Sequence, residues 1–307
     1  MSGVKRDWSG KLKRDGPKPA HPAPARNAFT PMFERLRDEL DEHHDRRERI
    51  VKLSRDITAL SKKIIFSLQR VRKIEPQLPK NIQDEVDARL AEIAKLLAAL
   101  APEIQGLNRY RYSRSLMCLE ELVEALTFAH YLKTQTLIRY EDLCATVEDL
   151  TRQGIAAVAT SSEDQVMTDA ADGPKQADAT KPDPPATVSL TQDDYLYGIF
   201  DLTGEMMRFA TTTLALTGVL AGSESSTSGD EPRTILQDMH DLGSFFEMLP
   251  VGGGSRFQWE KKLEVTRQSV QKVERLGYDW IIRGSEKPKG WVPDLSALDQ
   301  GPPEEDE

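Results

Sequence analysis

The chain has 307 residues, a formal net charge of −9 and two cysteines. Two cysteines provide neither a disulfide framework nor a cysteine-based zinc site, and the negative charge disfavours a uniformly basic nucleic-acid-binding protein. Contact with RNA or DNA must therefore come from a local patch or from a partner subunit. The sequence has no run of about 18 apolar residues and no apolar stretch behind its basic N-terminus, so we expect neither a membrane span nor a secretory signal.

The first 27 residues are rich in proline and charge and poor in aliphatic side chains, which predicts a disordered basic tail. Two basic clusters in this tail, Lys5-Arg6 and Lys11-Leu12-Lys13-Arg14, fit a nuclear import signal and a solubilising tail equally well. Together with the low cysteine content, which suits a reducing compartment, they lead us to expect a cytoplasmic and nuclear protein.

A very long helix is predicted from about Thr30 to Ile74, because threonine can cap a helix, Pro31 is accepted in its first turn, and Pro76 and Pro79 end it. Its apolar side chains recur at helical spacing as a stripe for a core or a subunit interface: Ile50, Leu53, Ile57, Leu60, Ile64, Leu68 and Val71. Basic side chains lie roughly opposite: Lys52, Arg55, Lys62, Lys63 and Arg70. This basic face is read as a solvated surface, or alternatively as a contact for RNA phosphates through Lys52, Arg55, Lys62 and Lys63. Ile65 and Phe66 lie off the apolar stripe, so the C-terminal half of this helix is apolar on more than one side and is expected to meet a partner.

Helical periodicity continues along the rest of the chain. It predicts helices at about 81–101, 107–132, 140–150, 195–217, 232–249 and 257–282. Residues 151–188 contain no aromatic side chain and are rich in small and polar residues, which predicts a flexible insertion. No strand pattern is present, so we expect an all-α bundle, a helical domain over residues 28–298 that contains this insertion and is followed by an acidic tail at 299–307.

Two of the predicted helices carry carboxylates among core-like residues. Glu121 and Glu124 are three residues apart, and Asp201 and Glu205 are four apart, so each pair shares a helix face. Because burying unpaired carboxylates is costly, a hard cation such as Mg²⁺ or Mn²⁺ is a candidate partner. Such an ion can activate water against a phosphodiester.

Other readings of these acids stay open at this point. The acids could be surface residues paired with neighbours such as Arg208 or Lys133, and spacing does not choose between Glu120 and Glu121. Gly204 lies between the two acids of the second pair, where it indicates either a close helix approach or room for an ion or phosphate. Other sites are excluded, because the glycine run 252–254 lacks the lysine of a nucleotide loop and no Glu-x-x-His motif for a di-iron centre occurs.

Several stretches, found in the same order along the chain, resemble the translin family. In the two acid-bearing runs the matching residues are Glu121, 123–125, Phe128, His130, 133–134, 194–196, Gly198, 201–205 and 207–208. Further matching stretches lie at 33–41, 44–45, 48–49, 51–58, 61–62, 65–66, 261–263, 268–269, 272–274, 283–286 and 288–289. The resemblance covers roughly residues 30–150 and 188–298.

The resemblance implies a single domain of about seven helices and the catalytic branch of the family, because translin itself lacks the acids that match Glu121, Glu124, Asp201 and Glu205. It implies a Mg²⁺-dependent endoribonuclease, with Mn²⁺ as an alternative ion, that cleaves single-stranded or nicked RNA. The first three acids would hold the metal, and Glu205 would ligate it or orient the attacking water.

The resemblance also implies assembly with translin into a closed, octameric hetero-oligomer. The family removes passenger strands in RNA silencing and trims fragments from transfer-RNA precursors. Two alternatives from other classes are a non-catalytic scaffold that stabilises translin and a DNA-binding partner, to which translin would supply the basic surface.

Overall fold

The computed structural model describes residues 27–163, 186–222, 233–249 and 256–283, and these residues form an all-α fold, as predicted. Eight α-helices are present in them: α1 (Thr30–Leu68), α2 (Lys80–Leu100), α3 (Asn108–Arg111), α4 (Cys118–Thr134), α5 (Tyr140–Glu163), α6 (Gln192–Thr217), α7 (Ile235–Met248) and α8 (Arg256–Arg283). Two short 3-10 helices are η1 (Ala101–Ile104) and η2 (Ser113–Ser115). Since α3 is a single turn, seven longer helices build the fold.

Two compact units divide the chain, Met1–Asp45 and Arg46–Glu307. In the first unit, Phe29 just before α1 and four residues in the first turns of α1 expose apolar side chains: Met32, Phe33, Leu36 and Leu40. The second unit contains the hydrophobic core and all residues of the predicted acid site. The predicted tails, apart from Asn27, and residues 164–185 of the predicted insertion lie outside the described residues.

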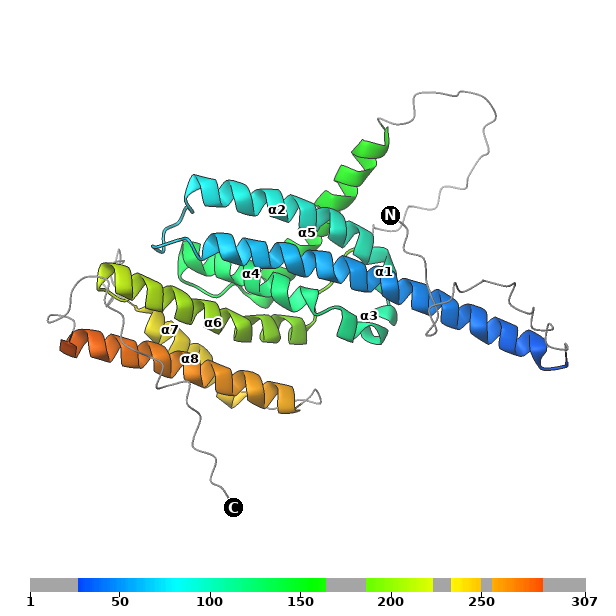
Figure 1. Ribbon diagram of the computed structural model, residues 1–307. Helices are drawn as coiled ribbons and strands as arrows, with labels where there is room; N and C mark the ends of the chain where they lie inside the picture. Colours follow the sequence, from blue (N-terminus) through cyan, green and yellow to red (C-terminus); the bar gives the residue numbers. More distant parts are fainter. Residues whose placement is uncertain (1–26, 164–185, 223–232, 250–255, 284–307) are drawn as a thin grey trace, which may run out of the picture. The chain divides into compact units, whose positions relative to one another are not determined.

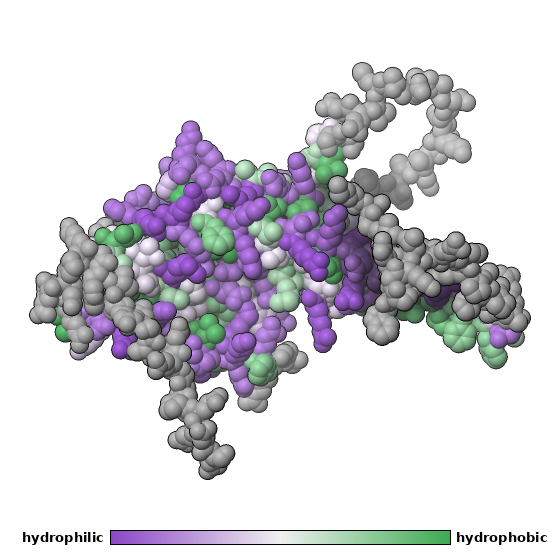
Figure 2. Space-filling view, viewed as in Figure 1, coloured by the Kyte–Doolittle hydropathy of each residue, from purple (hydrophilic) through white to green (hydrophobic). Residues whose placement is uncertain are grey.

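Within the second unit, the helices that carry the predicted acids are central. Helix α6 packs against α4 on one side and against α8 on another, and α7 packs against both α6 and α8, as Figure 1 shows. Helix α2 packs against α5. Figure 2 shows mostly hydrophilic side chains over the described helices on the face in view, with apolar side chains in small separate patches. Among the described residues, no helix has the length and apolarity to cross a membrane.

Three helix boundaries differ from the predicted ones. Helix α1 ends at Leu68 rather than near Ile74, because its last turn tightens: the Arg70 N–H donates to Ser67 O and the Val71 N–H to Leu68 O, both three residues back. The predicted helix at 107–132 is broken into α3, η2 and α4.

The third difference is that α5 continues to Glu163, so residues 151–163 are helix and not part of a flexible insertion. Two features explain the extension. Alanines at 156, 157 and 159 favour helix, and α5 packs closely on α2, where a Cβ on Gly154 would lie 1.9 Å from Ala94 O. Thr151 is fully buried in this contact region of α5.

Candidate active site

Helix α4 is buried on nearly all sides and nevertheless carries three glutamates in its first two turns. Leu119, Leu122 and Val123 have no exposed surface, and Glu124 is only 9% exposed. The helix therefore cannot turn all of its acids to water. An acid on such a helix must face another element of the protein.

The facing element is α6, and a glycine allows the two helices to approach. A Cβ on Gly198 would lie 2.5 Å from Val123 Cγ1, a distance that real side chains do not tolerate. Asp201 and Glu205 follow Gly198 by three and seven residues, so they share its helix face and are directed toward α4. This close approach brings the two predicted acid pairs together.

Glu124 is the centre of the group. Burial first, and then the negative charges of Asp201, Glu121 and Glu205, together raise the pKa of Glu124 to about 8, against a smaller opposing effect of Lys262. Within the described part of the chain, the Glu124 carboxylate makes no hydrogen bond and no ion pair. A buried acid that faces three others without a direct partner is a place where a cation would lower the free energy.

Two of the other acids have partners on α1 and α6. Lys62 Nζ lies 3.7 Å from Glu121 Oε2, and Gln69 Nε2 donates to Glu205 Oε2 at 2.8 Å. Arg208 Nε lies 3.6 Å from the same Glu205 oxygen. The predicted pairing with Arg208 is therefore present at Glu205, but the Glu205 side chain is 12% exposed and is not a surface acid. The sequence analysis missed Gln69, which lies just beyond the end of α1.

Asp201 is held by a residue from the other end of the chain. Lys262 on α8 donates to both Asp201 carboxylate oxygens at 2.7 Å, and its ammonium lies 5.4 Å from the centre of the Tyr197 ring. In the sequence, Lys262 stood out only as part of the family resemblance. Helical periodicity could have placed it on the inner face of α8, but not opposite Asp201.

The structure separates Glu120 from Glu121, which spacing could not do. The pKa of Glu120 is raised to about 7, mainly by burial, with Lys262 opposing the rise and Asp201, followed by Asp194, adding to it. The strongest charge effects on Glu124 come from Glu121 and the two acids of α6, and Glu120 is not among them. Glu121 therefore belongs to the acid group, and Glu120 lies at its edge.

Gly204 lies beside the group with open space around it. A Cβ added to Gly204 would meet no atom of the described chain within 4 Å. Its predicted role in a close helix approach is thus wrong, and Gly198 has that role instead. The other reading, room for an ion or a phosphate, is compatible with this open space and with the Asp201 side chain, which is 41% exposed.

The donor chemistry of the four acids suits a hard divalent cation, since all their ligand atoms are carboxylate oxygens. As the side chains lie, however, no three or more His, Cys, Asp or Glu residues in the described ranges are arranged to hold a metal ion. Positive charges next to the acids come instead from Lys62, Arg208 and Lys262. The residues fit such an ion in chemistry, and Asp201 would have to exchange Lys262 for it.

The predicted basic face of α1 lies on the surface. Lys52, Arg55, Lys62 and Lys63 are all exposed, and Lys62 also reaches the acid group through Glu121. Their contact with RNA phosphates stays a prediction.

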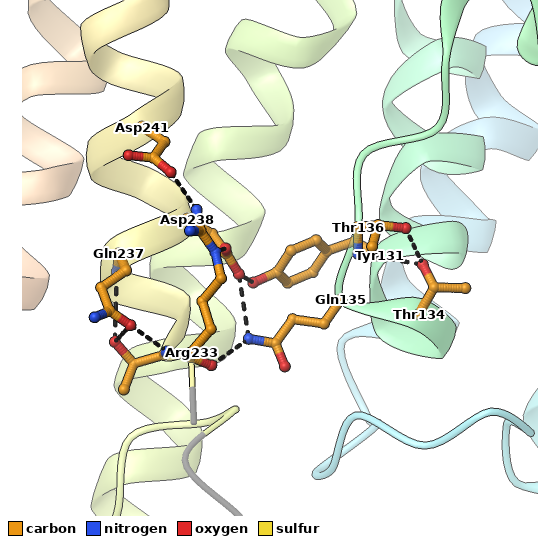
Figure 3. A network of polar contacts seen from close by, with 9 residues as sticks. Tyr131, Thr134, Gln135, Thr136, Arg233, Gln237, Asp238 and Asp241 are labelled. Atoms are coloured by element: carbon orange, nitrogen blue, oxygen red, sulfur yellow. Dashed lines mark hydrogen bonds and ion pairs between the residues drawn. The ribbon is translucent and has the colours of Figure 1, made fainter. Parts of the chain in front are cut away.

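Figure 3 shows a polar network that anchors the end of α4 to the start of α7. Tyr131 Oη donates to Asp238 Oδ2 at 2.6 Å, and Arg233 forms an ion pair with the same carboxylate. Gln135, in the left-handed conformation at φ 52°, caps α4 and donates through Nε2 to Arg233 O at 2.6 Å. This network fixes the end of the helix on which Glu121 and Glu124 lie.

Comparison with known proteins identifies relatives along most of the chain. The family model described as "Translin family" matches residues 45–284. Mouse "Translin-associated protein X" is 32% identical over 271 residues, covering 87% of this chain and 83% of the mouse protein. The "Translin-associated protein X homolog" of Schizosaccharomyces pombe is 30% identical over 251 residues, covering 81% of this chain and 86% of the yeast protein.

Among solved structures, the "Crystal structure of apo-NeC3PO" matches with a TM-score of 0.52 at 18% identity, covering 83% of this chain and 98% of that one. At this identity the match supports the fold alone. The family match extends from residue 45 to residue 284 and includes both acid-bearing helices. The chain therefore belongs to the translin family.

Proposed function

We propose that this chain is the catalytic subunit of a hetero-oligomer with translin, and that it is a Mg²⁺-dependent endoribonuclease that cleaves single-stranded or nicked RNA. The observation that carries this proposal is the buried Glu124 carboxylate, which has no direct partner among the described residues and faces three further acids. Relatives named for their association with translin support the choice of partner. A closed octameric shell is the assembly that we expect.

Glu121, Glu124 and Asp201 are the residues that would hold the ion, and Glu205 would either ligate it or orient the attacking water. Bound Mg²⁺, or Mn²⁺ in its place, supplies an activated water and stabilises negative charge on the phosphodiester. Gln69 keeps one oxygen of Glu205 occupied and leaves the other to act, because it donates to Oε2 alone. Arg208, which is 61% exposed beside Glu205, would contact a substrate phosphate.

The cellular processes that we propose follow from the family: removal of cleaved passenger strands in RNA silencing and trimming of transfer-RNA precursor fragments. DNA is an alternative ligand for the same complex. Cytoplasm and nucleus are the compartments in which these substrates occur.

A second candidate is a non-catalytic scaffold that stabilises translin. One observation favours it: lysines, rather than an arrangement of three ligands, neutralise two of the acids. In that case Lys62 and Lys262 would be permanent partners of Glu121 and Asp201.

The two candidates are distinguished by cleavage of a labelled single-stranded RNA by the full-length chain co-purified with translin, in Mg²⁺ and in chelator. We expect Mg²⁺-dependent cleavage that is abolished in Glu124→Gln. The matched control is Glu92→Gln, which makes the same change at an exposed position of α2 and should cleave like the unmodified chain. Cleavage by Glu124→Gln at the unmodified rate would overturn the proposed site, and RNA binding without cleavage in every variant would favour the scaffold.

A further inference from the structure

One aromatic side chain near the acid group is exposed to solvent. Phe66 on α1 is 67% exposed, and in residues 46–68 it is the one large apolar side chain with that exposure. Lys62 precedes it by four residues and Gln69 follows it by three, spacings that place all three on one side of the helix. Lys62 contacts Glu121, and Gln69 contacts Glu205. By this spacing, Phe66 lies along the chain between Lys62 and Gln69, the two residues that contact the acid group from α1 and from the turn after it.

The exposed surface around Phe66 is basic rather than apolar. Lys63 and Arg70 flank it on one side, and Lys52 and Arg55 continue the same exposed face toward the start of the helix. Arg70 is held by Glu85, with 2.5 Å between Arg70 Nη2 and Glu85 Oε2. A protein-protein contact centred on Phe66 would be expected to have other apolar side chains around it. Here the exposed neighbours of the ring on the helix and in the turn after it are cations, of which Lys62 and Arg70 are also paired with Glu121 and Glu85.

An exposed aromatic ring within a basic surface is the combination that binds single-stranded nucleic acids, because bases stack on the ring while cations follow the phosphates. We infer that Phe66 is a stacking platform for an unpaired base of the RNA, next to the bond to be cleaved, with Lys62 and Lys63 near the adjoining phosphates. This inference rests on the proposed function and gives it a source of specificity. A base within a continuous duplex is already stacked and cannot reach the ring, whereas a base in a single strand or at a nick can.

The test separates binding from cleavage. Affinity of the full-length chain in complex with translin is measured in chelator by the fluorescence anisotropy of a labelled single-stranded RNA. Phe66→Leu keeps an apolar side chain but removes the aromatic face, and should weaken binding by about 5- to 100-fold. Phe66→Trp keeps the aromatic face and should bind at least as tightly as the unmodified chain. Affinity for a fully paired RNA of the same sequence should not change in either variant.

A control variant also replaces an exposed aromatic residue by leucine, at a position far along another helix. Tyr278 on α8 is 64% exposed and lies 16 residues beyond Lys262, and Tyr278→Leu should leave RNA affinity unchanged. A series of RNAs that each lack one base provides the direct evidence for stacking. At one position, loss of the base should weaken binding to the unmodified chain as much as Phe66→Leu does, and the two changes together should cost no more than either alone.

Equal RNA affinity of Phe66→Leu and the unmodified chain would overturn the inference. So would dissociation of the translin complex by Phe66→Leu, seen as a lower mass in native mass spectrometry, because the ring would then contact a protein partner. These outcomes are independent of the nuclease. If the unmodified complex cleaves RNA in Mg²⁺ and Phe66→Leu binds normally, the stacking inference fails and the proposed function stands. If the unmodified complex does not cleave, the proposed function fails whatever Phe66 does.

Discussion

Glu124 gives the proposed site a pH signature that can be measured without any RNA. Its pKa is raised from an ordinary value of 4.5 to about 8, first by burial and then by the neighbouring acids. The folded chain keeps this proton to higher pH than the unfolded chain does. The contribution of protonated Glu124 to the free energy of unfolding is therefore complete below about pH 4.5 and is lost progressively as the pH rises to about 8. Glutamine, which stays neutral, removes this loss.

The size of the effect follows from the shift. The pKa of Glu124 lies about 3.5 pH units above its ordinary value, and each pH unit corresponds to about 1.4 kcal/mol. The contribution of this group to the free energy of unfolding is therefore at most about 5 kcal/mol. Since part of the Glu124 shift comes from the charges of the neighbouring acids, we expect Glu124→Gln to be about 2–3 kcal/mol more stable to unfolding than the unmodified chain at pH 9. At pH 5 the two should differ by less than about 0.5 kcal/mol.

Urea unfolding of the full-length chain in chelator, at pH 5 and at pH 9, measures both values. Glu92→Gln serves as the control, and it should change stability by less than about 0.5 kcal/mol at either pH because its side chain is exposed. The reasoning is refuted if Glu124→Gln is less stable than the unmodified chain at pH 9. That result would mean that the carboxylate is stabilised by contacts that the described residues do not provide.

Further predictions concern α6 and the basic face of α1. Gly198→Ala should destabilise the fold by about 1–3 kcal/mol, because its Cβ would be forced against Val123. Gly204→Ala, in the same helix but in open space, should stabilise it by about 0.5–1 kcal/mol. Urea unfolding measures both, and equal effects of the two would contradict the helix contact described above. Replacing Lys52 and Arg55 together by glutamate should weaken RNA binding and flatten its dependence on salt. Unchanged affinity over a salt series would show that this face is only solvated.

Much of the fold could be predicted from local pattern, because each long helix has its own apolar stripe. The ends of the helices were predicted less well. Gly154 lies past the predicted end of α5 and allows this helix to pack closely on α2. The composition of residues 151–163 does not reveal this contact. Periodicity predicts each helix separately, whereas the end of α5 depends on the contact between two helices.

The acid site, too, could be predicted within each helix but not between helices. The spacing of Glu121, Glu124, Asp201 and Glu205 predicted two acid pairs on two helices, and the structure brings them together through the close approach at Gly198. Lys262, which holds Asp201 from a helix 61 residues further along the chain, could not be paired with it from spacing alone.

The central claim is that the acids of α4 and α6 form a divalent metal centre, and Mn²⁺ binding tests it most directly. Electron paramagnetic resonance of free Mn²⁺, titrated with the full-length chain in complex with translin, gives the affinity and the number of ions bound. We expect the unmodified chain and Glu92→Gln to bind Mn²⁺ equally, and Glu124→Gln and Asp201→Asn to bind it at least about 10-fold more weakly. Equal Mn²⁺ affinity of the unmodified chain and the three variants would contradict a metal centre at these acids. The acids would then be charges that Lys62 and Lys262 neutralise.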